Sequence, residues 1–204
     1  MEYKIDKELS SNQLQFAISP EDVIHIRQNS IVSKTANINV TKSGSGSILS
    51  YFSSSSKKFP LKSIDSKGKT GYLTIAPPLP GEIAEIEPMG DGVKVSTLFF
   101  LGYVGDGYDI KVKSGILDDN KNLGTMILSG SNESIFIYGF NGIKTINLEE
   151  GQQTKVKQDY LIGLDETVSH HLEDNFLKLV GPGTVYIHAS SPFIMQDVFE
   201  KLGN

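Results

Sequence analysis

The chain has 204 residues, a formal net charge of −5 at pH 7 and no cysteine. The missing cysteine excludes disulfides, a cysteine nucleophile, iron–sulfur clusters and thiolate zinc sites, and the negative charge argues against nucleic acid, DNA in particular, as the main ligand. Hydrophobic residues make up 38% of the sequence, enough for a packed core, and the 20 glycines and 8 prolines suit many short strands joined by turns.

The first residues, Met1 to Lys7, mix charged and polar side chains and contain no apolar run. They match neither a secretory signal nor an arginine-rich transit peptide. No later run reaches the roughly 20 apolar residues that span a bilayer. The sequence therefore predicts a cytoplasmic protein.

Short strands are predicted from the start of the chain, at residues 14–18, 23–26 and 31–33. Each segment is rich in β-branched or aromatic residues and is bounded by polar or turn-forming residues. We interpret them as the first, and faintest, of three related units.

Residues 41–69 interrupt the strand pattern with alternating serine and glycine, then a run of serines, then several lysines. We expect a flexible excursion from a single domain that spans residues 1–204. Aromatic residues lie among the lysines, so the segment could contact an anionic membrane surface or an RNA backbone, and a plain solvated loop is the alternative. The candidate contact residues are Lys57, Lys58, Lys62, Lys67 and Lys69.

The clearest repeat relates residues 81–103 to residues 142–164, at an offset of about 60 residues, as expected for a duplicated supersecondary unit. A glycine opens a short strand in both copies. The later segments VSTLFFLGY and VKQDYLIGL align so that Phe99 matches Tyr160 and Gly102 matches Gly163. Each copy follows a further strand, at 72–75 and at 135–138, so we count three pseudo-repeated units.

Two further strands alternate apolar and polar residues. Residues 108–113 place tyrosine, isoleucine and valine on one face, and residues 185–189 place Val185 and Ile187 on one face with Tyr186 and His188 on the other. Period-two patterning gives one core face and one wet face. The fold predicted is all-β, an antiparallel sandwich or closed barrel.

The C-terminal residues 191–202 have the pattern of a short helix. Ser191 can cap it, Pro192 suits its first turn, and the apolar residues that follow lie near one face. The helix either packs on the sandwich or is offered to a partner subunit.

The order of these segments resembles the AIM24 family, formerly a domain of unknown function. The most specific parts are the Gly-Pro-Gly at 181–183 before a last strand and the repeated order of glycine and strand. The resemblance implies a sandwich like that of the tryptophan RNA-binding attenuation protein, three pseudo-repeated units and a tendency to oligomerise. It brings no catalytic residue. The segments that carry it are residues 71–100, 129–130, 140–143, 148–151, 159–162 and 180–186.

The four histidines, His25, His170, His171 and His188, lack the spacing of a cupin metal site. His170 and His171 are adjacent, so on a strand they would point to opposite faces, and His171 could share a face with Glu173. We favour a surface turn for this segment, with a metal site as the alternative.

Acidic clusters and nucleophile motifs give no stronger candidate. Residues 118–124 resemble a calcium loop but lack the EF-hand glycine and glutamate, which favours a polar turn. Glu82, Glu85 and Glu87 are expected along a solvated strand edge. The sequence has no nucleophile elbow, and its glycine-rich stretches lack the context of a phosphate-binding or dinucleotide-binding loop.

We therefore expect no catalytic, cofactor-binding or metal-binding residues. The sequence predicts a non-enzymatic β-sandwich that self-associates, with a trimer favoured, and acts as a scaffold or interaction module. The alternative is a small-ligand or RNA-binding module, and an enzyme on a cupin-like barrel is less well supported. The sequence does not indicate which protein would be a partner.

Overall fold

The computed structural model describes residues 1–7, 12–42, 61–87, 92–105, 108–114, 124–130 and 134–191. Strands β1 to β19 make up most of these residues, and every strand pair in them is antiparallel. The all-β antiparallel fold predicted from the sequence is confirmed. The helix predicted at 191–202 lies outside the described residues, apart from Ser191.

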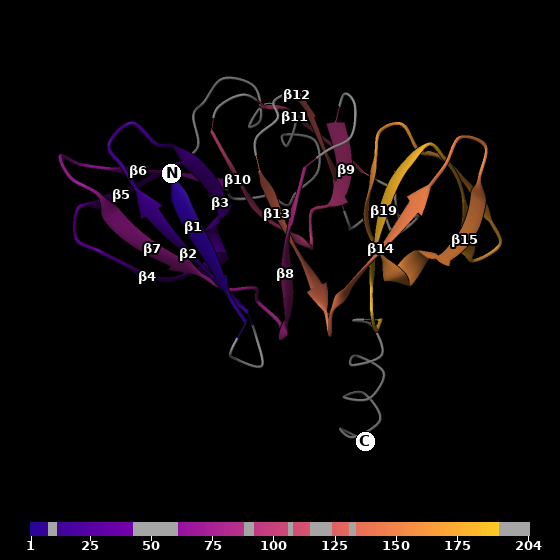
Figure 1. Ribbon diagram of the computed structural model, residues 1–204, viewed down its shortest axis with the longest axis horizontal. Helices are drawn as coiled ribbons and strands as arrows, with labels where there is room; N and C mark the ends of the chain where they lie inside the picture. Colours follow the sequence, from indigo (N-terminus) through magenta and orange to yellow (C-terminus); the bar gives the residue numbers. More distant parts are fainter. Residues whose placement is uncertain are drawn as a thin grey trace, which may run out of the picture.

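The strands follow one another in three runs of six, which lie side by side along the long axis of the molecule (Figure 1). The first run is preceded by β1 (Glu2–Asp6) and consists of β2 (Gln13–Ile18), β3 (Ile24–Arg27), β4 (Ile31–Lys34), β5 (Ile38–Lys42), β6 (Leu61–Ser66) and β7 (Gly71–Ile75). The second consists of β8 (Gly81–Ile86), β9 (Gly92–Ser96), β10 (Phe100–Val104), β11 (Tyr108–Ser114), β12 (Gly124–Gly130) and β13 (Ile135–Phe140). The third consists of β14 (Ile143–Leu148), β15 (Gln153–Lys157), β16 (Leu161–Asp165), β17 (Ser169–Glu173), β18 (Phe176–Val180) and β19 (Gly183–His188).

The strands of each run pair in the same order. In the first run β7 lies between β2 and β4, and β6 lies between β3 and β5. In the second run β13 lies between β8 and β10, and β12 between β9 and β11. In the third run β19 lies between β14 and β16, and β18 between β15 and β17. The strands predicted at 72–75 and 135–138 are therefore β7 and β13, the last strands of the first and second runs.

Neighbouring runs share sheets through two strand pairings, which we call the internal junctions. The first internal junction pairs β3 with β10, and the second pairs β9 with β16. Each produces a six-stranded sheet, of order β5-β6-β3-β10-β13-β8 or β11-β12-β9-β16-β19-β14. The two remaining sheets, β1-β2-β7-β4 and β15-β18-β17, have no such extension among the described strands.

Two hydrophobic clusters fill the spaces between the sheets. The larger contains residues of the first two runs together with Ile162 and Tyr186, and the smaller belongs to the third run. Val185 packs in the smaller cluster, while its neighbour Tyr186 packs in the larger one, so both faces of β19 are buried. The prediction that Tyr186 and His188 lie on a wet face is wrong, because β19 is covered on both sides.

The described parts of the predicted excursion at residues 41–69 include two strands. Its first residues belong to β5, and residues 61–66 form β6, which pairs with both β5 and β3. Ile64 and Leu61 are buried in the core, which fixes the register of β6. Residues 43–60, with Lys57 and Lys58, lie outside the described residues.

The third strand of each run contains a bulge, and in the second and third runs this strand also forms the internal junction. The register shifts between Phe100 and Gly102 in β10, and between Leu161 and Gly163 in β16. A Cβ atom on Gly102 would lie 2.6 Å from the carbonyl oxygen of His25, and one on Gly163 would lie 2.6 Å from that of Lys94. Glycine lets the paired strands approach this closely at both internal junctions, because a side chain there would press against the backbone of the paired strand.

Candidate functional site

The two outermost strands of the run pattern, β4 and β15, each have one open edge among the described residues. β4 is the counterpart of β10 and β16, whose edges pair with the preceding run, and it has the same bulge, between Ile31 and Ser33. β15 is the counterpart of β3 and β9, whose edges pair with the following run. The two open edges lie at opposite ends of the molecule (Figure 1).

The bulge residue of β4 is exposed where its counterparts are buried. Val32 is 56% exposed, whereas Leu101 in β10 and Ile162 in β16 are both 0% exposed. Ile162 reaches β13 of the preceding run, because a Cβ on Gly139 would lie 3.1 Å from its Cδ1 atom. Val32 is therefore an apolar side chain of the kind that packs on a preceding run, and no described strand covers it.

The open edge of β15 has a similar apolar residue beside it. Phe176 in β18 pairs with Lys157 of β15 and is 43% exposed. The residues at the same place in the other runs, Leu61 and Thr125, are 7% and 2% exposed. Tyr72 adds to the other end: it lies in β7, next to β4, and is 62% exposed. Three of the four large hydrophobic side chains exposed in the described part of the chain thus lie at the open ends.

The surface at the β15 end is charged. Lys155 Nζ lies 2.7 Å from a carboxylate oxygen of Glu173 in β17, and both side chains reach solvent. Their hydrogen bond raises the pKa of Lys155 and lowers the pKa of Glu173. At the β4 end, Lys34 Nζ donates to the carbonyl oxygen of Ile38, at 3.0 Å. Both open edges therefore carry lysine, a residue that commonly limits unwanted pairing of strand edges.

The described members of the predicted lysine patch are spread along β6 and the turn after it. Lys62 lies in β6 opposite Ile26 and is half-buried, whereas Lys67 and Lys69 are exposed in the turn before β7. The turn is held by Asn37, whose carbonyl oxygen accepts the Lys67 N–H and whose side-chain amide donates to the Lys69 carbonyl. These three lysines therefore lie in the first run, on β6 and the turn after it, and not on the open strands β4 or β15.

The histidines occupy three different settings. His25 is buried at the first internal junction, where its ring stacks on Tyr103 with centroids 4.6 Å apart. His170 and His171 lie in β17, so the predicted surface turn is wrong for them; the turn follows at Asp174. The strand forms because Leu172 packs against the smaller core while residues 169–173 pair with β18.

His188 is the most deeply buried histidine. Its Nδ1 accepts the Phe140 N–H at 2.9 Å, and the ring of Phe99 packs edge-on against it at a centroid distance of 4.0 Å. Burial lowers the pKa of His188 to about 4, so the ring is neutral at physiological pH. Within the described residues its Nε2 has no hydrogen-bond partner. Its role is to fix β19 against the second run.

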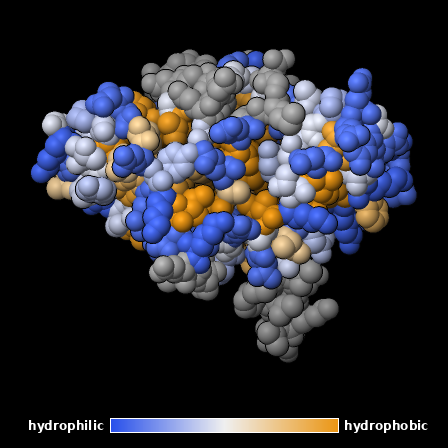
Figure 2. Space-filling view, in the orientation of Figure 1, coloured by the Kyte–Doolittle hydropathy of each residue, from blue (hydrophilic) through white to orange (hydrophobic). Residues whose placement is uncertain are grey.

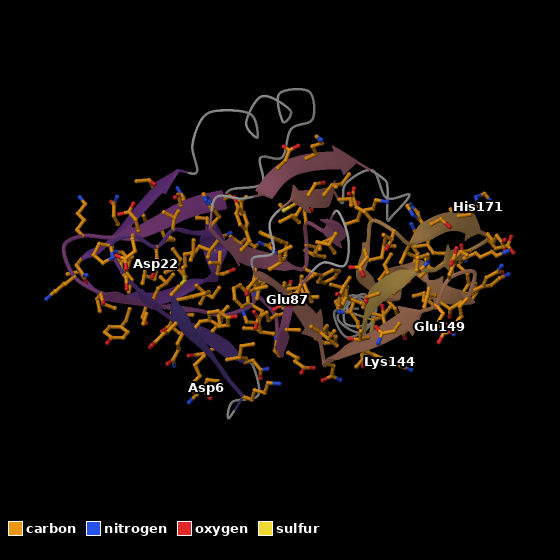
Figure 3. The ribbon with its side chains drawn as sticks, turned by 45° about the horizontal axis from the view of Figure 1, so that its top comes forward. Asp6, Asp22, Glu87, Lys144, Glu149 and His171 are labelled. Carbon is orange, nitrogen blue, oxygen red and sulfur yellow. The ribbon has the colours of Figure 1, made fainter. Side chains whose placement is uncertain are left out.

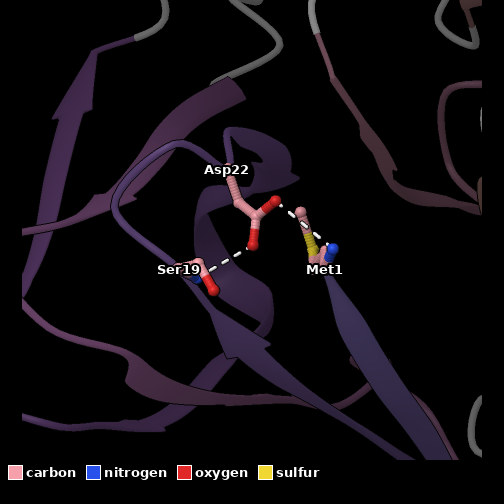
Figure 4. Close-up of polar contacts among 3 residues, drawn as sticks. All are labelled: Met1, Ser19 and Asp22. Carbon is pink, nitrogen blue, oxygen red and sulfur yellow. Dashed lines mark hydrogen bonds and ion pairs between the residues drawn. The ribbon is translucent and has the colours of Figure 1, made fainter.

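Several acidic residues hold neighbouring segments together through hydrogen bonds and an ion pair. Glu82 in β8 accepts the Ile143 N–H at 3.0 Å, and Glu85 accepts hydrogen bonds from Tyr3 and Ser134. Asp22 accepts the Ser19 N–H at 2.8 Å and pairs with the amino group of Met1 at 3.3 Å (Figure 4). The Glu85 and Asp22 contacts join the N-terminal segment to the first two runs, and the Glu82 contact joins the second run to the third. Glu82 and Glu85 lie at the edge of a sheet as predicted, since β8 is its last strand.

The labelled charged residues lie apart on separate elements (Figure 3), and no group of three or more histidines and carboxylates in the described part of the chain could hold a metal ion. The predicted polar turn at 118–124 lies outside the described residues for all but Gly124.

On the face shown in Figure 2, hydrophobic side chains are exposed in separate patches across the middle of an otherwise hydrophilic surface. No helix among the described residues is long and apolar enough to cross a membrane.

Sequence reasoning missed the open edges. A signal was present, because the repeat that aligns Gly102 with Gly163 has Ser33 at the same place in the first run. Serine in place of this glycine distinguishes β4, whose outer edge has no neighbour among the described strands, from β10 and β16.

The fold and these edges define a class: an all-β protein of three interlocked antiparallel sandwiches with an open strand at each of its two ends. The chain belongs to the AIM24 family, since the family model described as "Mitochondrial biogenesis AIM24" matches residues 3–190. The resemblance noted in the sequence is thereby confirmed.

A crystal structure of a Streptococcus pyogenes protein has the same fold. It is 18% identical in sequence, the match covers 98% of this chain and 99% of that chain, and the TM-score is 0.81. No curated protein matches the sequence.

Proposed function

We propose that this protein is a non-enzymatic, cytoplasmic scaffold that self-associates head to tail, with β4 of one copy pairing with β15 of the next. The observation that supports this most is the exposure of Val32 and Phe176, whose counterparts in the other runs are buried. Contact between copies would repeat a pairing that the chain already makes twice, between β3 and β10 and between β9 and β16. The three runs are, in this proposal, repeats of one unit.

The two open edges differ, so the contact joins different surfaces of the two copies. Such a contact forms a closed ring when the rotation between copies divides a full turn, and otherwise forms a filament. We favour the trimer predicted from the sequence, in which three copies make a ring of nine runs. Closure would leave neither β4 nor β15 open, which removes the usual hazard of exposed strand edges.

The decisive experiment measures mass by sedimentation velocity across micromolar concentrations. The wild-type protein should be a trimer. Val32→Asp and Phe176→Asp should each shift it to monomer, because a buried carboxylate at the junction has no partner. Leu79→Asp is the matched control, since Leu79 is 42% exposed but lies outside both open edges. A wild-type protein that stays monomeric at these concentrations contradicts the proposal.

Mixing the two variants tests the head-to-tail geometry. The V32D copy still has a normal β15 end, and the F176D copy still has a normal β4 end, so an equimolar mixture should form a dimer with one intact junction. A self-complementary contact through a single surface would give no such dimer.

A further inference from the structure

The internal junctions and the open edges share a backbone geometry but differ at two side chains, Ser33 and Lys34. We propose that Ser33 and Lys34 keep the junction between copies weak enough to be reversible, whereas the two junctions within the chain are permanent. This inference rests on the proposed head-to-tail association and adds how that association is controlled.

The register of the junction between copies follows from the internal ones. Gly102 pairs with Ile26 and Tyr103 with His25; Gly163 pairs with Val95 and Leu164 with Lys94. β15 carries Lys155 and Val156 at the places of His25 and Ile26, as its pairing with β18 shows. In a junction between copies, Ser33 would therefore face Val156 and Lys34 would face Lys155.

Ser33 adds a steric cost at that junction. A Cβ at the equivalent glycine positions would lie 2.6 Å from the carbonyl oxygen of the residue before the paired one, which is His25 or Lys94. In the junction between copies this oxygen belongs to Lys155. The strands must separate by several tenths of an ångström to admit the Ser33 side chain, which lengthens the hydrogen bonds beside it.

Lys34 adds an electrostatic cost. Its counterpart Tyr103 stacks on His25, and Leu164 faces Lys94, so neither internal junction opposes two like charges. Lys34 would face Lys155, and like charges directly opposite in a sheet are destabilising. Glu173 reduces this cost, because it holds the ammonium group of Lys155 over β17 at 2.7 Å. Lys178, His171 and Asp174 are the other charged or titratable groups close to this pair.

The test compares dissociation constants for wild type, Ser33→Gly, Lys34→Tyr and the double variant by sedimentation equilibrium. We expect S33G to tighten association about tenfold, since relief of overpacking is worth of that order. K34Y should tighten it about two- to fivefold by removing the like-charge pair. Glu173→Gln should weaken it by a similar factor, and added salt should reverse the E173Q effect because it screens lysine repulsion.

Two matched controls separate these effects from general ones. Ser169→Gly places glycine at an exposed site on the edge strand β17, away from both open edges, and should leave association unchanged. Asp109→Asn removes the exposed ion pair of 3.0 Å between Asp109 and Lys111 on β11 and should also have no effect.

The outcomes separate this inference from the proposed function. If wild type assembles and S33G and K34Y assemble no more tightly, the inference is overturned and the scaffold proposal stands. If neither wild type nor the double variant assembles, the head-to-tail contact itself is wrong. If only the double variant assembles, Ser33 and Lys34 block the edge outright, which overturns both statements.

Discussion

The edges of β10 and β16 differ from the edge of β4 in almost every side chain, although all three strands have the same bulge and the same place in their runs. The covered edges present glycine, leucine or isoleucine and an aromatic or aliphatic residue. The open edge presents Ser33, Val32 and Lys34. The comparison shows that each run has the same strand pairing whether or not its edge is covered. The side chains on that edge differ according to whether a neighbouring run pairs with it.

The largest expected effect comes from removing a buried bulge residue. Ile162→Ala should lower the free energy of unfolding by about 3 kcal/mol, because it empties a fully buried position between the second and third runs. Val32→Ala, at the same place in β4, should change it by less than about 0.5 kcal/mol in dilute monomer. Urea denaturation of both variants measures the difference, and equal losses would show that the two edges are alike.

The pH dependence of stability should report on the contact between the second and third runs. His188 has a pKa of about 4 when folded and an ordinary value near 6.5 when unfolded, so the unfolded chain binds the proton first as pH falls. The stabilisation is complete above pH 6.5 and is lost between pH 6.5 and pH 4, by about 3 kcal/mol.

His188→Asn supplies the control for this pH effect, since its side-chain oxygen can still accept the Phe140 N–H but does not titrate. Urea midpoints for the variant should vary less over that window than those of wild type. Parallel profiles for the two proteins would rule out His188 as the titrating group.

Substitution of an internal-junction glycine should have the next effect. Gly102→Ala places a Cβ against the carbonyl oxygen of His25 and should cost about 2 kcal/mol through strand separation. Ser33→Ala, in the open strand, should leave the thermal midpoint of the monomer unchanged. A G102A protein as stable as wild type would mean that the junction can widen freely, and Ser33 would then have no steric effect either.

The smallest expected effect on the monomer is that of Glu173→Gln. Its ion pair with Lys155 is exposed, and exposed pairs contribute little to folding. The melting temperature should therefore match that of wild type, even though association weakens. A clear drop in melting temperature would assign the pair a role within the third run instead.

Much of the fold could be predicted because it depends on local patterns. The alternation at 108–113 and the strands at 72–75 and 135–138 follow directly from apolar spacing and turn residues. The fold class and the family resemblance are both confirmed.

Two of the predictions that failed depended on neighbours distant in sequence. His188 was expected in water because period two assumes one wet face, and the second run covers that face. Residues 61–66 of the predicted excursion form β6, because they pair with residues 24–27 of β3, a pairing that local composition does not reveal. The turn predicted at His170 and His171 is a strand, β17, which pairs with β18 as a hairpin. The polar composition of the segment suggested a turn there, and the actual turn follows at Asp174.

The internal junctions have a consequence for synthesis on the ribosome. β3 belongs to the first run, but the strand that covers its edge, β10, is made later in the second run. Until then the nascent chain presents an edge equivalent to that of β15. Domains fold as they emerge, and neighbouring chains on one message are close together, so the β10 of one chain can fill the edge of another. Strand exchange between nascent chains is therefore a misfolding route that this architecture opens.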